Sequence, residues 1–284
     1  MVEALTGSVL DGRFKIIGEV GRGRFAIVYK ALDEETDESV AVKVLHEEVS
    51  PEGKDFLRFK REAELAAALE HPNIASVYGF GVADYQFPYV VMEYVTGLLL
   101  SARLSFEGRL PFKTAAPILI QICDAMSYAH EQGIIHRDLR PENVFLEEID
   151  GKADVVKIVD FGVAKNIKSH EQKRLTGEGE LLGTPEYASL EQILGEEIDA
   201  RADIYSMGCL MYKMLSGQLP FSGRTAGDIL MQKAESAPLD FSDPSRGRHL
   251  PQSIQDVVKQ SISNEVSERP QSMQEIRTII EKCL

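Results

Sequence analysis

The stretch Ile134–Asn143, which reads IIHRDLRPEN, is the part of the sequence around which the rest of the chain is organised. It places a carboxylate, Asp138, five positions before a carboxamide, Asn143, and Pro141 stiffens the chain between them. Apolar residues lead into this stretch and out of it. A polar loop between two buried segments is a common way to present catalytic groups on a rigid base. An ordinary salt-bridged turn is the alternative, so the interpretation depends on the flanking sequence.

Composition indicates a globular protein without a membrane-spanning segment. The 284 residues, 44% hydrophobic and 27% charged, suffice for one large domain or two lobes. A net charge of −14 disfavours a general nucleic-acid or anionic-membrane binder, because both need a cationic surface. The three cysteines lie far apart, as free thiols in a reducing compartment do. No signal peptide is evident, and no apolar run approaches the roughly 20 residues of a membrane span. We therefore expect a cytoplasmic protein.

The first third of the chain is rich in strand signals. Residues 1–13 predict a short polar leader, and three strand-like runs between Phe14 and about Val44 predict an antiparallel meander. Ser50-Pro51-Glu52 is a typical helix start, and helical spacing of apolar residues continues to about Glu70. Two more strands follow, at Ile74–Gly81 and Pro88–Tyr94, before a predicted hinge at Thr96-Gly97.

After the hinge, the pattern becomes helical. Predicted helices cover Phe112–Gln132, Ala200–Ser216, Asp228–Ala234, Ile254–Ser261 and Met273–Lys282. Asp150-Gly151 predicts a hairpin between Val144–Glu147 and Val155–Val159, and residues 163–186 predict a long loop. The sequence therefore predicts one α+β domain over residues 1–284. It has a strand-rich lobe at about 14–95 and a larger helical lobe at about 96–284.

A glycine-rich stretch, GRGRFA at positions 21–26, separates two predicted strands. Glycines let a backbone approach a phosphate closely, although a plain hairpin turn is an equal alternative. A dinucleotide-binding fold needs a helix after the glycines. The strand-like run at 26–32 therefore disfavours that fold.

Three charged residues occupy positions that suit a phosphate or metal site. Lys43 lies in the strand-like run AVKV, where an inward-facing charge is costly unless it is paired. Glu62 is placed on the helix to be its partner. The alternatives are an edge-strand lysine facing water and a solvated glutamate. Asp160, in DFG after an apolar strand, suits Mg²⁺, which takes one or two carboxylates plus phosphates, although DFG is also a frequent turn.

The order of these motifs is decisive. The glycine loop, AVK, a helical glutamate, HRDLRPEN, DFG, and GTPEY with SLE at 183–191 occur in that order. From about Phe14 to its C-terminus the chain resembles the eukaryotic-type (Hanks-type) Ser/Thr protein kinases, and it is most similar to their bacterial members. Each motif is weak alone, but six in the right order exclude coincidence.

The resemblance implies ATP-dependent transfer of the γ-phosphoryl group to protein Ser/Thr hydroxyls. Asp138 would orient the hydroxyl and accept its proton. Asn143 and Asp160 would hold Mg²⁺, for which Mn²⁺ can substitute. Lys43 would grip the α- and β-phosphates, and Glu62 would hold Lys43 in place.

The same resemblance implies a nucleotide site and a brace for the loops. Met92 would be the gatekeeper, Asp203 would brace the catalytic loop, and Arg269 would pair with Glu191 below the substrate groove. The expected ATP-binding residues are Val20, Gly21, Arg22, Gly23, Arg24, Phe25, Ala26, Val28, Ala41, Lys43, Met92, Glu93, Val95 and Phe145.

The resemblance also implies the acceptor specificity of the enzyme and its regulation by phosphorylation. PEN after Asp138 and Thr184 in GTPEY favour Ser/Thr acceptors over tyrosine. Arg137 would receive an activation-loop phosphate, for which Thr176 is the first candidate acceptor and Ser169 the second. Self-association for autophosphorylation is then expected.

Two positions depart from the family pattern. Arg140 stands where most Ser/Thr kinases have lysine, and a planar guanidinium is not equivalent to a compact ammonium. Leu190 replaces the usual proline before Glu191. Because arginine keeps the positive charge, we expect Arg140 to act in catalysis with reduced or retuned turnover rather than loss of activity. The alternative is a pseudokinase, a nucleotide-binding scaffold with low turnover, whereas GTPEY and SLEQ disfavour a small-molecule kinase. Bacterial relatives often carry a membrane span and sensor repeats, so the chain is either a free-standing kinase or an excised domain.

Overall fold

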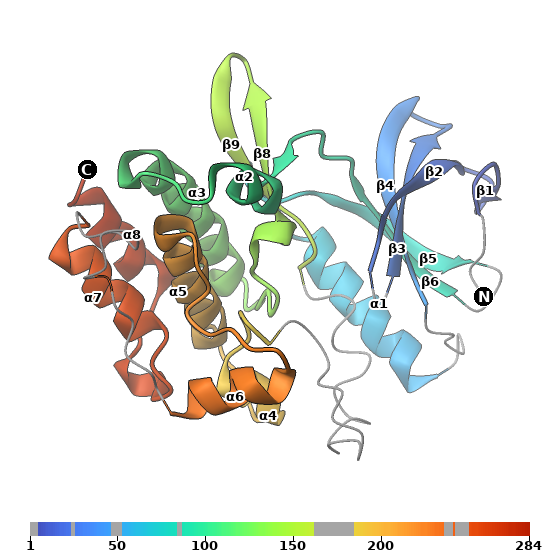
Figure 1. Cartoon of the computed structure of the whole chain (residues 1–284). Helices are drawn as coiled ribbons and strands as arrows, with labels where there is room; N and C mark the ends of the chain where they lie inside the picture. The colour runs from blue at the N-terminus through green and yellow to red at the C-terminus, as the bar shows by residue number, and fades with distance from the viewer. Residues whose placement is uncertain are drawn as a thin grey trace. The chain divides into compact units, whose positions relative to one another are not determined.

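The computed structural model describes residues 5–23, 26–46, 53–83, 87–161, 185–235, 241 and 250–284. The chain forms two compact units, the first running to Thr96 and the second beginning at Gly97 (Figure 1). A Cβ atom at Gly97 would lie 2.5 Å from the carbonyl oxygen of Leu146, so this position requires glycine.

The first unit is a six-stranded antiparallel sheet with one helix packed on it (Figure 1). The strand order is β1-β2-β3-β4-β6-β5, and the adjacent pairs β2–β3 and β3–β4 confirm the predicted meander. The elements are β1 (Val9–Leu10), β2 (Phe14–Arg22), β3 (Ala26–Asp33), β4 (Glu38–Leu45), α1 (Lys54–Ala67), β5 (Val77–Ala83) and β6 (Phe87–Glu93).

Both faces of this sheet carry apolar clusters, because successive side chains of a strand point to opposite faces. On β4, Val42 and Val44 belong to one cluster with Ile27 and Val91. Ala41, two positions before Lys43, belongs to the other cluster, which the side chains of α1 join. Lys43 therefore shares the face of the sheet that α1 covers.

The N-terminal segment and the start of α1 differ from the predictions. The segment expected as a leader is part of the sheet, because β1 pairs with β2 and the amide of Gly7 donates to the carbonyl of Ile16 at 2.9 Å. The Tyr89 hydroxyl donates a hydrogen bond to the carboxylate of Asp11 and fastens this segment to β6. Gly53 is the N-cap of α1. The predicted cap at residues 50–52 lies outside the described residues.

The second unit consists mainly of helices; α5 packs against α7 and α3, and α8 packs against the same two helices (Figure 1). Every residue of α5 from Ala202 to Ser216 except Lys213 is buried, which confirms the predicted buried helix. The elements are β7 (Leu98–Leu99), α2 (Leu100–Glu107), α3 (Phe112–Glu131), η1 (Pro141–Asn143), β8 (Val144–Ile149), β9 (Lys152–Ile158), α4 (Leu190–Leu194), α5 (Arg201–Ser216), α6 (Ala226–Ala234), α7 (Gln252–Ser261), η3 (Val266–Glu268) and α8 (Met273–Glu281).

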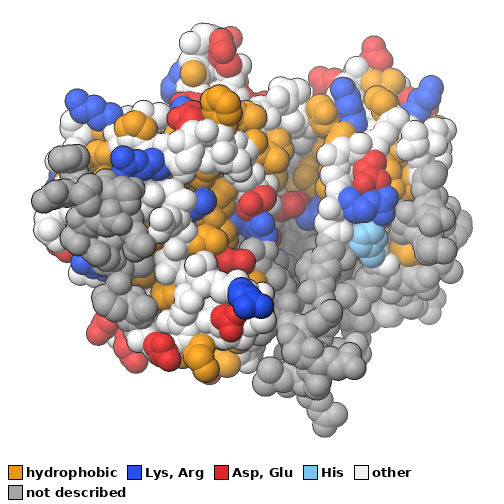
Figure 2. Space-filling view, in the orientation of Figure 1, with side chains coloured by type: hydrophobic (Ala, Val, Ile, Leu, Met, Phe, Trp, Pro, Cys, Tyr) orange, Lys and Arg blue, Asp and Glu red, His pale blue; other side chains and the backbone are white. Residues whose placement is uncertain are grey.

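The β8–β9 hairpin turns at the predicted pair, with φ values of 53° at Asp150 and 75° at Gly151. Two helices were not predicted. α2 buries only Leu100 and Leu104, and α4 has five residues, so neither has a recognisable apolar stripe. Among the described residues, no helix is long and apolar enough to cross a membrane. Acidic and basic side chains are interspersed over the visible face of the described part (Figure 2).

Candidate active site

The loop between α3 and β8 holds Asp138 and Asn143 against each other. The Nδ2 atom of Asn143 donates to the backbone carbonyl of Asp138 at 2.8 Å and to its Oδ2 atom at 3.2 Å. Asn143 is buried, and its backbone lies in the 3₁₀ turn η1 that Pro141 begins. The carboxylate of Asp138, which the sequence analysis singled out, is thus held by the carboxamide of Asn143.

Asp160 follows β9, which pairs with β8 directly after Asn143. The amide of Val159 donates to the backbone carbonyl of Asn143 at 3.0 Å, so the backbone of Asn143 is bonded to the residue before Asp160. Asp160 has a φ of 66°, a left-handed conformation that costs a non-glycine residue on the order of 1–3 kcal/mol. One carboxylate and one carboxamide are oxygen donors that suit Mg²⁺ bound together with phosphates.

A buried carboxylate, Asp203 at the start of α5, fixes the backbone before Asp138. It accepts hydrogen bonds from the amides of His136 and Arg137, each at 2.8 Å. The Nε2 atom of His130 lies 2.8 Å from the same carboxylate. A fully buried carboxylate requires such donors. Arg137 is held in this way at a φ of 65°.

His136 connects Asp138 to the strand end before Asp160. Its Nδ1 atom accepts the amide hydrogen of Asp138 at 3.1 Å, so the proton of the ring is on Nε2, which donates to the carbonyl of Val159 at 3.0 Å. Burial lowers the pKa of His136 below its usual value. The ring contacts that of Phe161, with 4.5 Å between centroids. The neutral imidazole therefore joins the two strand-flanking loops of the site.

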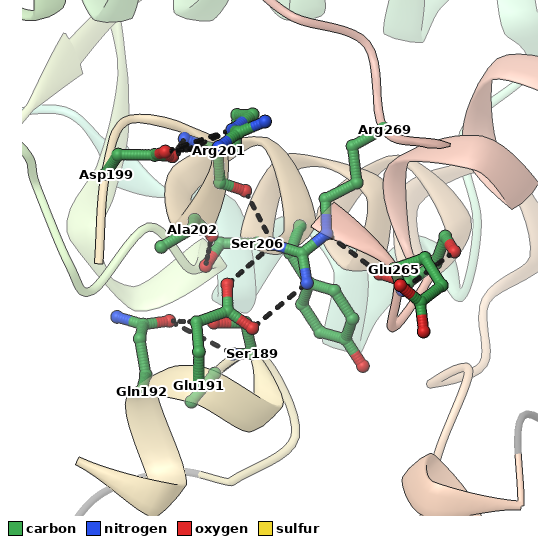
Figure 3. A network of polar contacts seen from close by, with 12 residues as sticks. Ser189, Glu191, Gln192, Asp199, Arg201, Ala202, Ser206, Glu265 and Arg269 are labelled. Carbon is green, nitrogen blue, oxygen red and sulfur yellow. Dashed lines mark hydrogen bonds and ion pairs between the residues drawn. The ribbon is translucent and has the colours of Figure 1, made fainter. Parts of the chain in front are cut away.

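A second polar network holds the segment around α4 (Figure 3). Arg269 is buried and donates to both oxygens of Glu191, at 2.6 and 3.0 Å. It also donates to the backbone carbonyls of Arg201 at 3.0 Å and Ser263 at 2.8 Å. Burial alone would raise the pKa of Glu191, but the hydrogen bonds and the charge of Arg269, together with hydrogen bonds from Ser189 and the backbone, hold that pKa below its usual value.

Leu190, one of the two departures, is the first residue of α4 and is preceded by the N-cap Ser189. The amide of Ser189 donates to Oε1 of Gln192 at 3.0 Å, and Nε2 of Gln192 donates to the carbonyl of Arg137 at 3.2 Å. One side chain thus connects the start of α4 to the loop that carries Asp138.

Arg140, the other departure, donates from Nε to Glu142 at 2.6 Å. Burial alone would lower the pKa of Arg140, but the hydrogen bond and charge of Glu142, together with the charge of Asp138, raise it above its usual value. The expected regulatory residues Thr176, Thr184 and Ser169 lie outside the described residues.

In the first unit, the glycine stretch begins at the end of β2 and ends at the start of β3. Gly21 pairs with Val28, and the amide of Gly23 donates to the carbonyl of Ala26 at 2.9 Å. Arg22 donates to Glu19 through two hydrogen bonds, at 2.9 and 2.6 Å. Arg24 and Phe25 lie outside the described residues. Because strand β3 follows the glycines, the structure excludes the dinucleotide-binding arrangement.

The other first-unit candidates gather on the face of the sheet that α1 covers. Val28, Ala41 and Met92 belong to one apolar cluster. Lys43 lies on the same face, and Glu62 is half-buried one turn after Phe59 of α1, which joins that cluster.

The remaining nucleotide-site candidates lie near strand ends. Val20 on β2 is 51% exposed. Glu93 ends β6, donates its amide to the carbonyl of Ser76 at 2.8 Å, and is followed by the half-buried Val95. Phe145, in the second unit, pairs with Leu99 and Lys157.

Comparison with known proteins settles the family. The sequence profile described as "Protein kinase domain" matches residues 14–279. The chain belongs to the protein kinase domain family. It is 37% identical to the serine/threonine-protein kinase pkn2 of Myxococcus xanthus over 270 residues, which are 94% of this chain and 32% of that protein. It is 35% identical to the serine/threonine-protein kinase PknB of Mycobacterium tuberculosis, over 96% of this chain and 43% of that protein.

Solved structures agree with this kinase fold. The PknI kinase domain of Mycobacterium tuberculosis has a TM-score of 0.74 at 24% identity and covers 99% of this chain and 100% of its own. Rad53 1-466 in complex with AMP-PNP has a TM-score of 0.75 at 30% identity, over 94% of this chain and 65% of its own. The kinase domain thus spans less than half the length of the two curated relatives described above.

Several residues of the kinase domain that hold the site were not predicted. Ser189 followed by Gln192 is a capping pattern that could have predicted the start of α4. Lys233, four positions after the buried Ile229, lies on the buried face of α6, which its i+4 spacing could have indicated. The contact of His130 with Asp203 joins residues 73 positions apart, and no local pattern predicts it.

Proposed function

We propose that this chain is a catalytically active, Mg²⁺- and ATP-dependent Ser/Thr protein kinase domain. The observation that carries the proposal is the fixed arrangement of Asp138, Asn143 and Asp160 in a domain of the protein kinase family. Phosphoryl transfer needs little covalent chemistry from the protein. It depends on positioning and on stabilising dispersed negative charge.

ATP would be bound by several residues of the first unit. Lys43 would contact the α- and β-phosphates and Glu62 would hold its ammonium group. The amides of the glycine stretch would cover the phosphates. Val28, Ala41 and Met92, already clustered, supply the apolar surface that an adenine ring favours.

In the second unit, Asp138 would accept the proton of the substrate hydroxyl and orient its oxygen. Asn143 and Asp160 would hold Mg²⁺, which neutralises charge on the phosphates. Since Nδ2 of Asn143 donates to Asp138, its Oδ1 atom is the one left for a metal. Arg140 would add positive charge beside Asp138.

Protein hydroxyls are the proposed acceptors. The curated relatives at 35–37% identity are named serine/threonine-protein kinases, which supports Ser/Thr specificity. The segment from Pro185 to Glu191, anchored by Arg269, would form the platform for the protein substrate. Free thiols at Cys123, Cys209 and Cys283 support a reducing compartment such as the cytoplasm.

Regulation by phosphorylation is a further part of the proposal. The backbone of Arg137 is fixed on both sides, by Asp203 at its amide and by Gln192 at its carbonyl. A phosphate on Thr176 would accept charge-assisted hydrogen bonds from the guanidinium group of Arg137. Self-association would supply this phosphate in trans. Thr176→Ala is expected to lower activity after incubation with ATP, and activity equal to wild type would contradict the assignment.

The decisive experiment measures transfer of label from γ-labelled ATP to a generic protein substrate with Mg²⁺. Asp138→Asn keeps the shape of the side chain and removes the proton acceptor, so we expect at least about a 100-fold loss of label. Asp256→Asn, on the exposed side of α7, is the matched control and should retain activity. Equal labelling by wild type and Asp138→Asn would overturn the proposal.

A further inference from the structure

Lys233 on α6 is a fully buried lysine that the proposed function does not use for ATP binding or for chemistry. Its side chain is 0% exposed. An ammonium group has three hydrogen-bond donors, and burying it is costly unless they are used. All three are used: Nζ donates to the carbonyl of Ala188 at 2.7 Å, to the Tyr205 hydroxyl at 3.0 Å and to the carbonyl of Glu186 at 3.3 Å.

Aromatic rings complete the surroundings of this ammonium group. Nζ lies 4.5 Å from the ring centroid of Tyr205 and 5.1 Å from that of Phe221, both within the range of cation–π contacts. Burial lowers the pKa of Lys233. Two carbonyl oxygens, a hydroxyl and two aromatic rings, rather than a carboxylate, supply the contacts of this ammonium group.

The carbonyls that Lys233 binds belong to the proposed substrate platform. Tyr187, between them, has a carbonyl that accepts from the Ser206 hydroxyl of α5 at 3.0 Å. Three successive carbonyls, at positions 186, 187 and 188, thus accept hydrogen bonds from side chains of two helices. Residues 185–187 form a turn and Ala188 a bend, outside any strand or helix, so these side-chain hydrogen bonds help to fix the backbone of the segment.

α6 itself is fixed at both ends, so Lys233 can act as a rigid anchor. At its start, the Thr225 hydroxyl accepts the amide of Asp228 at 3.1 Å, and Asp228 accepts the amide of Thr225 at 2.9 Å. At its end, the carbonyl of Lys233 accepts from Asn264 at 2.7 Å. The helix lies beside α4, which begins at the end of the platform (Figure 1).

We propose that Lys233 is a positioning residue for the protein substrate: it holds the backbone at 186–188 in the shape that binds the acceptor segment. The inference rests on the proposed kinase function. It deepens that function because it assigns substrate binding, as distinct from ATP binding or chemistry, to a side chain that contacts neither ligand. Its removal should therefore raise the KM for protein substrate and leave the KM for ATP unchanged.

The test compares Lys233→Met, Lys233→Arg and Lys213→Met with wild type. Methionine keeps the length and apolar stem but removes all three donors. We expect about a tenfold increase in the KM for protein substrate, equivalent to about 1.4 kcal/mol. The KM for ATP and the slow hydrolysis of ATP without substrate should not change. Arginine keeps the donors and should restore part of the affinity. Lys213 also bonds a backbone carbonyl, that of Gly217 at 2.8 Å, so Lys213→Met controls for loss of a lysine–carbonyl bond elsewhere.

Two further measurements test the inference if Lys233→Met does not fold or if wild type shows no kinase activity. If Lys233→Met does not fold, Ser206→Ala removes the bond to the Tyr187 carbonyl with a smaller change, and it should raise the same KM to a lesser extent. Hydrogen–deuterium exchange of the peptide spanning 185–192 should increase in Lys233→Met, and that of 134–143 should not. Exchange does not need activity, so it tests the positioning role even if wild type transfers no label and the proposed function fails. An unchanged KM, parallel changes in both KM values, or unchanged exchange at 185–192 would overturn the inference.

Discussion

The carboxamide of Asn143 donates to the carboxylate of Asp138 at 3.2 Å and to its backbone carbonyl at 2.8 Å. The two residues proposed for metal binding and for proton acceptance are therefore not independent. Asn143 restrains the rotamer of Asp138, and the same contact directs the Oδ1 atom of Asn143 away from the Asp138 carboxylate. Replacement of either residue should affect both roles.

Asn143→Ala should lower kcat by roughly 100-fold or more, because it removes a metal ligand and the restraint on Asp138. The Mg²⁺ concentration for half-maximal rate should rise at the same time. Gln252→Ala, which removes an exposed amide bonded to Asp256, is the control and should leave both values unchanged. A normal Mg²⁺ dependence in Asn143→Ala would show that this carboxamide is not a metal ligand.

Arg140→Lys should increase turnover by roughly two- to tenfold, about 0.4–1.4 kcal/mol in the barrier. Arginine is held by Glu142 through Nε. Lysine has a methylene group in place of that Nε–H donor, so its compact terminal charge would be freer to approach a phosphate. The measurement is kcat with saturating ATP and substrate. A kcat equal to that of wild type, or lower, would contradict the interpretation that arginine at position 140 slows turnover.

Arg269→Ala should destabilise the fold by about 3–5 kcal/mol in chemical denaturation, because it leaves the Glu191 carboxylate buried without its cation. The neighbouring ion pair of Arg201 and Asp199, at 2.6 Å, is more exposed (Figure 3). Asp199→Ala should therefore cost less than about 1 kcal/mol. Similar losses in the two variants would mean that burial does not distinguish the pairs.

His136 should make the fold less stable below pH 6.5. Burial lowers its pKa in the folded state, whereas the unfolded chain binds a proton near pH 6.5. Between the folded-state pKa and that value the unfolded chain binds more protons, so stability falls as pH falls, by at most about 1.4 kcal/mol per pH unit. The nearby carboxylates of Asp138, Asp160 and Asp203 oppose this shift without reversing it.

The check is thermal unfolding of wild type and His136→Gln between pH 7 and pH 5. Glutamine does not titrate, so the variant should lose less stability over this range than wild type, whatever its absolute Tm. Parallel curves would show that His136 does not carry the pH dependence. His130 remains in both proteins and cancels in the comparison.

Local signals explain which predictions of the fold succeeded. α3, α5 and the β8–β9 hairpin were predicted because helical spacing and the Asp150-Gly151 turn are properties of neighbouring residues. α2 and α4 were missed because too few of their side chains are buried to produce a pattern. The segment of residues 5–13 was predicted as a polar leader, but it contains β1. Its polar sequence carries no strand pattern, and its pairing with β2 is a tertiary contact.

The sequence by itself determined the family, the kinase fold and the order of the motifs, because each motif is a short run whose chemistry depends on its own residues. Only the tertiary structure decided which distant groups meet: Asp203 with the amide of His136, 67 positions away, and Lys233 with the carbonyl of Ala188, 45 positions away. The physical reason is burial. A polar group removed from water must find a partner within hydrogen-bond distance, and packing, not sequence separation, decides which partner that is.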